Sequence, residues 1–255
     1  MILEEFALLA SDTVRTKAYL QAMICEEKLP AICIVYSDNI SKMQNEAKQY
    51  RNDTGKTEYF NTQIPILYSL HSANIPYVLV EEKDINSEQI KTILQETQQK
   101  YFIYSGYGGY ILKTHLFQMD KKFIHVHAGI LPQYRGSTTV YYSFLQEKGF
   151  GATAIFLSEG IDEGEIITYD MFEVPDKPVN VDYVYEPYMR SRVLIKAIDQ
   201  YLKGGFCSDI QNSEGAETYF IIHPVLKHIA MLGMEKEWEK NNYETSNIYT
   251  TSRSC

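Results

Sequence analysis

The chain of 255 residues is predicted to fold as a mostly parallel β-sheet covered by helices on both faces, followed by a small α+β extension. Short apolar runs alternate with amphipathic segments through about the first 150 residues, which is the pattern of strands and crossover helices. Hydrophobic residues make up 45% of the chain and charged residues 22%, so it can bury a sizeable core. The Pro-Asp-Lys-Pro break at 175–178 ends the alternation.

Turn and capping residues bound the expected elements of the first part. We expect the first helix to run from Val14 to Leu29, with Ser11 or Asp12 as its cap and Pro30 as its stop. The polar stretch 37–62, which contains Asn-Asp-Thr-Gly at 52–55, is expected to loop out. The expected strands are 6–10, 31–36, 77–80, 101–104, 122–126, 152–157 and 165–172, and the remaining expected helices are 66–73, 87–99 and 138–147.

The change of pattern predicts two units, a main domain over 1–175 and a C-terminal extension over 176–255. The extension is expected to contain an amphipathic helix over 184–202, a short strand over 219–222 and a helix from Val225. From Lys236 onward the sequence is polar without a period, which is typical of a frayed tail.

Charge and cysteine content favour a cytoplasmic protein. The formal net charge of −9 disfavours charge-driven nucleic-acid binding. The N-terminus is acidic where a signal peptide is basic, and no apolar run reaches membrane-spanning length, so we expect no membrane partner. Four widely spaced cysteines without a Cys-x-x-Cys pair are expected to be free thiols in a reducing compartment: Cys25, Cys33, Cys207 and Cys255.

The run Ile-His-Val-His-Ala-Gly-Ile-Leu-Pro-Gln-Tyr-Arg-Gly at 124–136 carries the candidate chemistry. His125 and His127 stand two apart at the end of an expected strand, and therefore on one face of it. Asp162 follows on a glycine-bounded acidic turn. Ligands bind at the carboxyl ends of parallel strands, where a histidine and a distant aspartate can form a base and its orienting partner.

Other interpretations of the same residues stay open on the sequence. His127 could be a hydrogen-bonded core histidine, His125 a solvent-facing spacer and Asp162 a turn former. A His-x-His pair with Asp162 could also bind a metal ion, although the sequence offers no further ligand. Arg135 could bind an anion or pin its loop to a carboxylate, and we favour the second role.

His127, the Leu-Pro-x-Tyr-Arg-Gly run at 131–136 and the Ile-Asp-x-Gly-x-Ile run at 161–166 together resemble the folate-dependent formyltransferases. The resemblance covers residues 75–175. This stretch is similar to both the methionyl-tRNA formyltransferases and the sugar N-formyltransferases. It implies a Rossmann-like fold and formyl transfer from N10-formyltetrahydrofolate to an amine, without a metal. His127 and Asp162 match the family's catalytic histidine and aspartate.

His125 stands where the family has an asparagine. Asparagine offers an amide donor to the developing oxyanion, and a neutral histidine can still donate through one ring nitrogen. His125 is therefore a third candidate catalytic residue, and the replacement could preserve, alter or weaken the chemistry.

The resemblance also implies which residues contact the ligands. Two segments would form the walls of a pterin pocket, and the loop after His127 would contact the acceptor. The implied folate-binding residues are Gly106, Tyr107, Gly108, Gly109, Tyr110, Ile111, Leu112, Glu159, Gly160 and Ile161, and the implied acceptor-binding residues are Tyr134 and Arg135.

Elimination within the family points to a small-molecule amine as the acceptor. The turn Ala-Ser-Asp-Thr at 10–13 lacks the glycines of the phosphate loop in glycinamide ribonucleotide formyltransferases. The C-terminal part is short for a tRNA-binding domain, and the acidic charge agrees. A nucleotide-linked amino sugar is the favoured acceptor, and a homodimer is possible in such enzymes. Two alternatives remain, namely a formyltetrahydrofolate hydrolase and a non-catalytic folate- or nucleotide-binding relative.

Overall fold

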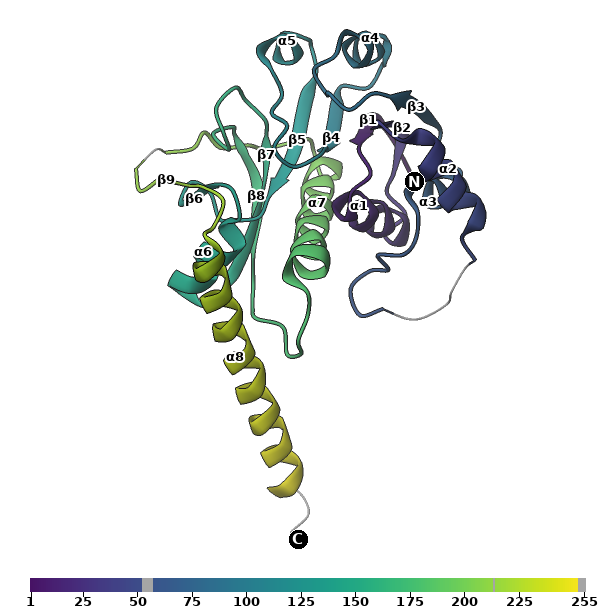
Figure 1. Cartoon of the computed structure of the whole chain (residues 1–255). Helices are drawn as coiled ribbons and strands as arrows, with labels where there is room; N and C mark the ends of the chain where they lie inside the picture. The colour runs from purple at the N-terminus through teal and green to yellow at the C-terminus, as the bar shows by residue number, and fades with distance from the viewer. Residues whose placement is uncertain (52–56, 213, 252–255) are drawn as a thin grey trace.

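The computed structural model describes residues 1–51, 57–212 and 214–251 (Figure 1). Its centre is a seven-stranded sheet in the order β3-β2-β1-β4-β5-β7-β8. The strands β1 to β5 pair in parallel, whereas β7 is antiparallel to both β5 and β8. The strands are β1 (Ile2–Ala10), β2 (Leu29–Ser37), β3 (Tyr77–Glu81), β4 (Tyr101–Ser105), β5 (Lys122–His127), β7 (Phe150–Phe156) and β8 (Ile166–Phe172).

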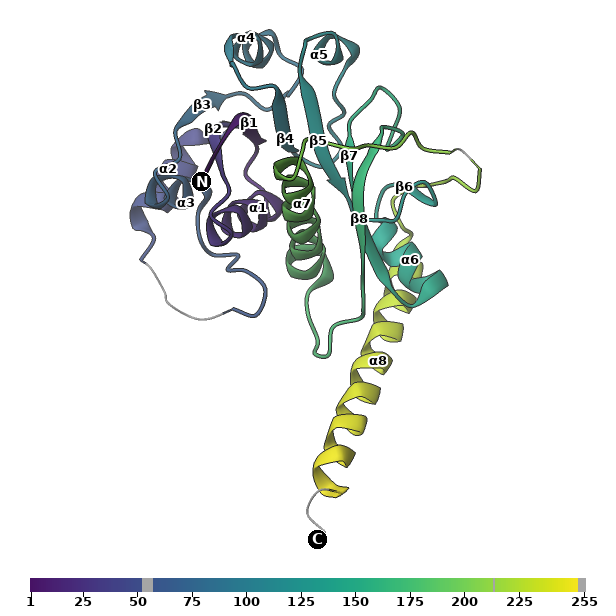
Figure 2. The same cartoon turned by 180° about the vertical axis from the view of Figure 1, so that it is seen from behind.

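Helices pack on both faces of this sheet, as expected. Alternate residues of β1 point to opposite faces, so that Leu8 joins one apolar core and Leu9 the other. Figure 2 shows the second view of this arrangement, with α1 and α7 beside each other and α4 and α5 apart from them. The first core receives α1 (Val14–Cys25), α2 (Ile40–Gln49), α3 (Ile66–Ser72), α6 (Thr139–Glu147), α7 (Glu186–Leu202) and α8 (Pro224–Thr251), and the second receives α4 (Glu88–Glu96) and α5 (Thr114–Phe117).

The first helix begins at Val14 as expected, but its cap differs and it ends four residues earlier than expected. Its cap is Thr13, whose hydroxyl accepts a hydrogen bond from the Thr16 N–H at 3.2 Å, in place of Ser11 or Asp12. The helix ends at Cys25, and Glu27 then adopts a left-handed conformation with φ of +54°. Pro30 therefore lies inside β2 and is not the residue that stops the helix.

The polar stretch expected as a loop contains the helix α2. Asn39 caps it by accepting a hydrogen bond from the Lys42 N–H at 3.1 Å. Only Ile40 and Met43 are buried, because α2 rests on the core with a narrow face. Ile40, Met43 and Ala47 have helical spacing, but polar residues make up the rest of the stretch and obscure it. The Asn-Asp-Thr-Gly run at 52–55 lies outside the described residues.

The C-terminal part begins with a π-helical turn (Val181–Tyr185) that leads into α7. Through residues such as Val193 and Leu194, α7 joins the same core as the sheet. The division after residue 175 stays a prediction. The short strand β9 (Glu217–Tyr219) precedes the expected 219–222 and pairs in parallel with β6 (Tyr134–Gly136).

The expected polar tail is the continuation of α8, which is helical to Thr251. Ala230, Met234 and Trp238, spaced four residues apart, are the side chains that α8 buries in the core. Beyond them the helix extends away from the body of the molecule (Figure 1). Within the described ranges, no helix is both long and apolar enough to cross a membrane.

Candidate active site

His127 ends β5 with its imidazole buried and held on one side. Its Nε2 lies 2.6 Å from the Tyr134 carbonyl oxygen and 3.2 Å from the Thr139 hydroxyl. The Thr139 hydroxyl donates to the Ala128 carbonyl oxygen at 2.6 Å, which leaves its lone pairs to accept from the imidazole. Two acceptors therefore assign a proton to Nε2, and Nδ1 is the nitrogen left for chemistry.

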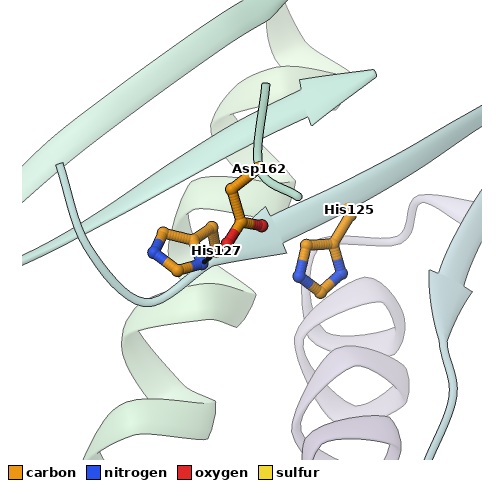
Figure 3. Close-up of side chains that lie close together, drawn as sticks. All are labelled: His125, His127 and Asp162. Atoms are coloured by element: carbon orange, nitrogen blue, oxygen red, sulfur yellow. Dashed lines mark ion pairs between the residues drawn. The ribbon is translucent and has the colours of Figure 1, made fainter. Parts of the chain in front are cut away.

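Asp162 faces that free nitrogen. Its Oδ2 lies 3.3 Å from His127 Nδ1 and accepts a hydrogen bond from the Gly136 N–H at 2.9 Å (Figure 3). Asp162 has φ of +54°, a conformation that only a tightly determined turn imposes on a non-glycine residue. Gly164 completes the turn, because a Cβ at this position would overlap the Phe156 carbonyl oxygen.

The His127–Asp162 contact offers one position for an exchangeable proton. With Nε2 protonated, a neutral imidazole would turn its Nδ1 lone pair toward the carboxylate, so the contact is attractive when a proton lies between Nδ1 and Oδ2. Burial lowers the pKa of His127, and the Asp162 charge opposes that shift. The pair is arranged to take up and release a proton at this one position.

His125 projects from the same face of β5 and differs in having an open nitrogen. Its Nδ1 is buried and has no hydrogen-bond partner among the described residues. Burial, followed by the charges of Arg15 and Arg190, lowers the pKa of His125 well below its usual value. Glu186 pairs with Arg190 at 2.6 Å. His125 is thus a neutral imidazole that stands ready to hydrogen-bond a ligand.

A pocket of about 130 Å³ opens beside His125 and Asp162. Both segments expected to form the folate site contribute to its wall, and the lining is mainly apolar and aromatic, which suits a flat ring. The lining residues are Tyr104, Tyr110, Ile111, Leu112, Phe117, His125, Leu157, Ser158, Gly160, Ile161 and Asp162.

The remaining residues of the expected folate segment at 106–112 do not line the pocket, and some of them hold this loop in place. A Cβ on Gly106 would overlap the hydroxyls of Tyr104 and Tyr36, so glycine is required there for packing. Tyr107 donates its hydroxyl to Ser37 Oγ at 3.1 Å. The expected residues that do not line the pocket are Gly106, Tyr107, Gly108, Gly109 and Glu159, and their contact with a ligand stays a prediction.

The side chains of Arg135 and Tyr134 are occupied by protein contacts. Arg135 donates to Gln211 Oε1 at 2.9 Å and pairs with Glu163 at 3.3 Å. The Tyr134 hydroxyl donates to Gln146 Oε1 at 2.8 Å, while its carbonyl holds His127. These contacts support the loop-pinning role for Arg135, and binding of the acceptor by either residue stays a prediction.

Three site residues were missed on the sequence. Thr139 begins a helix that was expected, 12 residues after His127 in the sequence. That short separation was the available signal. Arg190 donates to the Val126 carbonyl oxygen at 3.0 Å from α7. Gln211 donates to the carbonyl oxygens of Asp162 and Gly164 at 2.8 and 2.7 Å, from an irregular segment that carries no signal in sequence.

Comparison with known proteins identifies relatives that share this architecture. A methionyl-tRNA formyltransferase of Finegoldia magna is 25% identical over 188 residues, which cover 72% of this chain and 60% of the relative. A Clostridium beijerinckii protein of the same name is 25% identical over 231 residues, which cover 90% of this chain and 67% of the relative. This chain therefore spans only part of the curated relatives it matches.

Solved structures with the same fold include proteins named for different reactions. An N-formyltransferase from Helicobacter canadensis, in complex with folinic acid and dTDP-3-aminofucose, superposes with a TM-score of 0.52 at 18% identity and covers 86% of this chain and 71% of that one. A glycinamide ribonucleotide transformylase from Symbiobacterium toebii gives 0.54 at 18% identity and covers 81% and 93%. These likenesses establish the Rossmann-like formyltransferase fold. Residues 8–183, with β5 and the Asp162 turn inside them, match the family described as formyl transferase, and the chain belongs to that family.

Proposed function

We propose that this protein transfers the formyl group of N10-formyltetrahydrofolate to the amine of a small molecule, and that the acceptor is a nucleotide-linked amino sugar. The observation that carries the proposal is the His127–Asp162 pair beside a mainly apolar pocket. His127 Nδ1 lies 3.3 Å from Asp162 Oδ2, which leaves one position for a proton between them. Family membership supports formyl transfer as the reaction class.

The residues present fit each proton movement that the reaction needs. The amine nitrogen bonds to the formyl carbon, the bond from that carbon to N10 breaks, and the proton lost by the amine ends on N10. The Nδ1–Oδ2 position of His127 and Asp162 accepts and returns that proton. His125 lines the pocket, and one of its ring nitrogens supplies the hydrogen bond to the oxyanion that forms in between.

The turn between β1 and α1 argues against glycinamide ribonucleotide as the acceptor. Ser11 donates to the Ser105 carbonyl oxygen at 3.1 Å, and Thr16 donates to the Ser11 carbonyl oxygen at 2.8 Å. The N–H groups of Ser11 and Thr13 likewise donate to carbonyl oxygens of the protein, so they do not stand free to bind a phosphate. The net charge of −9 argues against tRNA. The Helicobacter canadensis structure, which holds an amino sugar nucleotide, supports the remaining class.

Tetrahydrofolate release with a panel of dTDP- and UDP-linked amino sugars tests the proposal. We expect release to require the amine and to fall by about 10²–10⁴-fold in His127→Ala and Asp162→Ala, because both variants remove the proton position. His71→Ala, on the exposed surface of α3, is the matched control.

Three outcomes would contradict this proposal. Wild-type turnover in both variants would show that the pair is not catalytic. Formate release at full rate without an amine would assign hydrolysis of the folate. Tight folate binding with no turnover over the panel would assign a binding relative that has lost the chemistry.

A further inference from the structure

We propose that His125, His127 and Asp162 also bind one divalent transition metal ion. Each of the three side chains offers one donor atom, and these atoms all lie within 4.8 Å of one another. Zinc bonds of 2.0–2.1 Å in a tetrahedral site place neighbouring donors about 3.3 Å apart. His127 Nδ1 and Asp162 Oδ2 already have that separation of 3.3 Å, so His125 alone has to approach.

The groups behind two of the donors are those that metal ligands use. His127 directs Nε2–H to the Tyr134 carbonyl oxygen at 2.6 Å, which fixes the ring and leaves the Nδ1 lone pair for a metal. Asp162 Oδ2 is oriented by the Gly136 N–H at 2.9 Å. Both ligands are therefore pre-oriented by backbone groups and need no rearrangement.

His125 decides whether the set can bind a metal. With an asparagine at this position, the site would offer one imidazole and one carboxylate, and an amide is a poor ligand for these metals. With His125 it offers two imidazoles and one carboxylate, and a ring nitrogen of His125 lies within 4.8 Å of the donor atoms of His127 and Asp162. Three protein ligands beside a pocket leave a fourth position for water or ligand.

The donor set and the surrounding charges select the kind of metal. Imidazole nitrogen suits Zn²⁺, Co²⁺, Ni²⁺ and Cu²⁺, whereas Mg²⁺ and Ca²⁺ require several oxygen ligands. The charges of Arg15 and Arg190 both act on His125, and Glu186 pairs directly with Arg190. An ion bound by charge alone is therefore disfavoured, and an ion bound through nitrogen affinity is favoured.

A bound metal would occupy the position through which the proposed formyl transfer moves its proton. The inference rests on the geometry of this site and does not require that the proposed reaction occurs. Metal and proton are then alternative occupants of the space between Nδ1 and Oδ2.

Equilibrium dialysis of tag-free, EDTA-treated protein against Zn²⁺ tests the inference, followed by the visible spectrum of the Co²⁺ form. We expect one tightly bound Zn²⁺ per chain and Co²⁺ bands of a low-coordinate nitrogen–oxygen site. His125→Asn should weaken this binding by at least about 100-fold, since even a change behind a ligand costs 10–100-fold. His71→Asn makes the same chemical change on the surface of α3 and should leave binding unchanged.

Asp162→Asn is a second variant that keeps side-chain size and should also lose the site. Circular dichroism of each variant checks that the fold is retained. Wild-type protein that binds no Zn²⁺, or His125→Asn protein with wild-type affinity and Co²⁺ spectrum, would overturn the inference. Binding is measured without a formyl donor or an acceptor, so its failure leaves the proposed reaction untouched, and failure of the reaction leaves the metal site untouched.

Discussion

His127 and His125 stand two residues apart on the same strand face, yet their surroundings differ in kind. His127 is 3% exposed and both of its nitrogens have partners, one on the loop after β5 and one on the Asp162 turn. His125 is half-buried and lines a pocket, and its Nδ1 has no hydrogen-bond partner among the described residues. One histidine is therefore fixed by the protein, and the other is left for a ligand.

The largest loss of stability among the contacts that fix His127 is expected from a substitution at Gly164. A Cβ there would overlap the Phe156 carbonyl oxygen, and backbone cannot move aside as a side chain can. We expect Gly164→Ala to lower the free energy of unfolding by about 3 kcal/mol or more, and to remove activity because Asp162 loses its position.

Gly149→Ala is the matched control for that experiment, because its Cβ would lie 3.7 Å from the Phe172 carbonyl oxygen in ordinary contact. Urea unfolding compares the two variants. Equal stabilities would show that the Asp162 turn is not held by this close approach.

The open side should respond to the chemistry of the side chain at position 125. His125→Ala removes the proposed donor to the oxyanion, and we expect kcat to fall by about 10²–10³-fold. His125→Asn restores an amide donor and should keep kcat within about tenfold of wild type. Single-turnover rates measured in EDTA separate the two variants. Equal rates in all three proteins would mean that His125 is a spacer.

The sequence predicts those features of the site that follow from the two-residue period of a strand. Two histidines at alternate positions of an apolar run had to share a face, and the carboxyl end of a strand in a mostly parallel sheet had to lie where ligands bind. The two pocket segments follow β4 and β7 of one sheet, but β7 runs antiparallel to β5, so this rule alone does not bring the second segment to the site.

The unpredictable part depends on contacts between distant segments. Gln211 holds the Asp162 turn from an irregular stretch, and only the folded chain brings it there. The left-handed φ of Asp162 follows from the fit of Gly164 under Phe156, which no local pattern encodes. The helix α2 was missed because polar residues surround its few apolar ones, and the continuation of α8 beyond Lys236 was missed because that stretch is polar and lacks a period.

The smallest effect is expected at Thr139, and it tests most directly how the protein positions His127. Thr139→Val keeps the shape of the side chain and removes one of two acceptors that hold the proton on His127 Nε2. The Tyr134 carbonyl remains, so we expect kcat to fall by only about 5–10-fold, the worth of one hydrogen bond, with KM for the folate unchanged. Thr139→Ser should restore the rate. Thr92→Val, which removes a hydroxyl bonded within the exposed surface of α4, is the control. A changed KM with a constant kcat would instead show that Thr139 shapes the binding of a ligand and does not position His127.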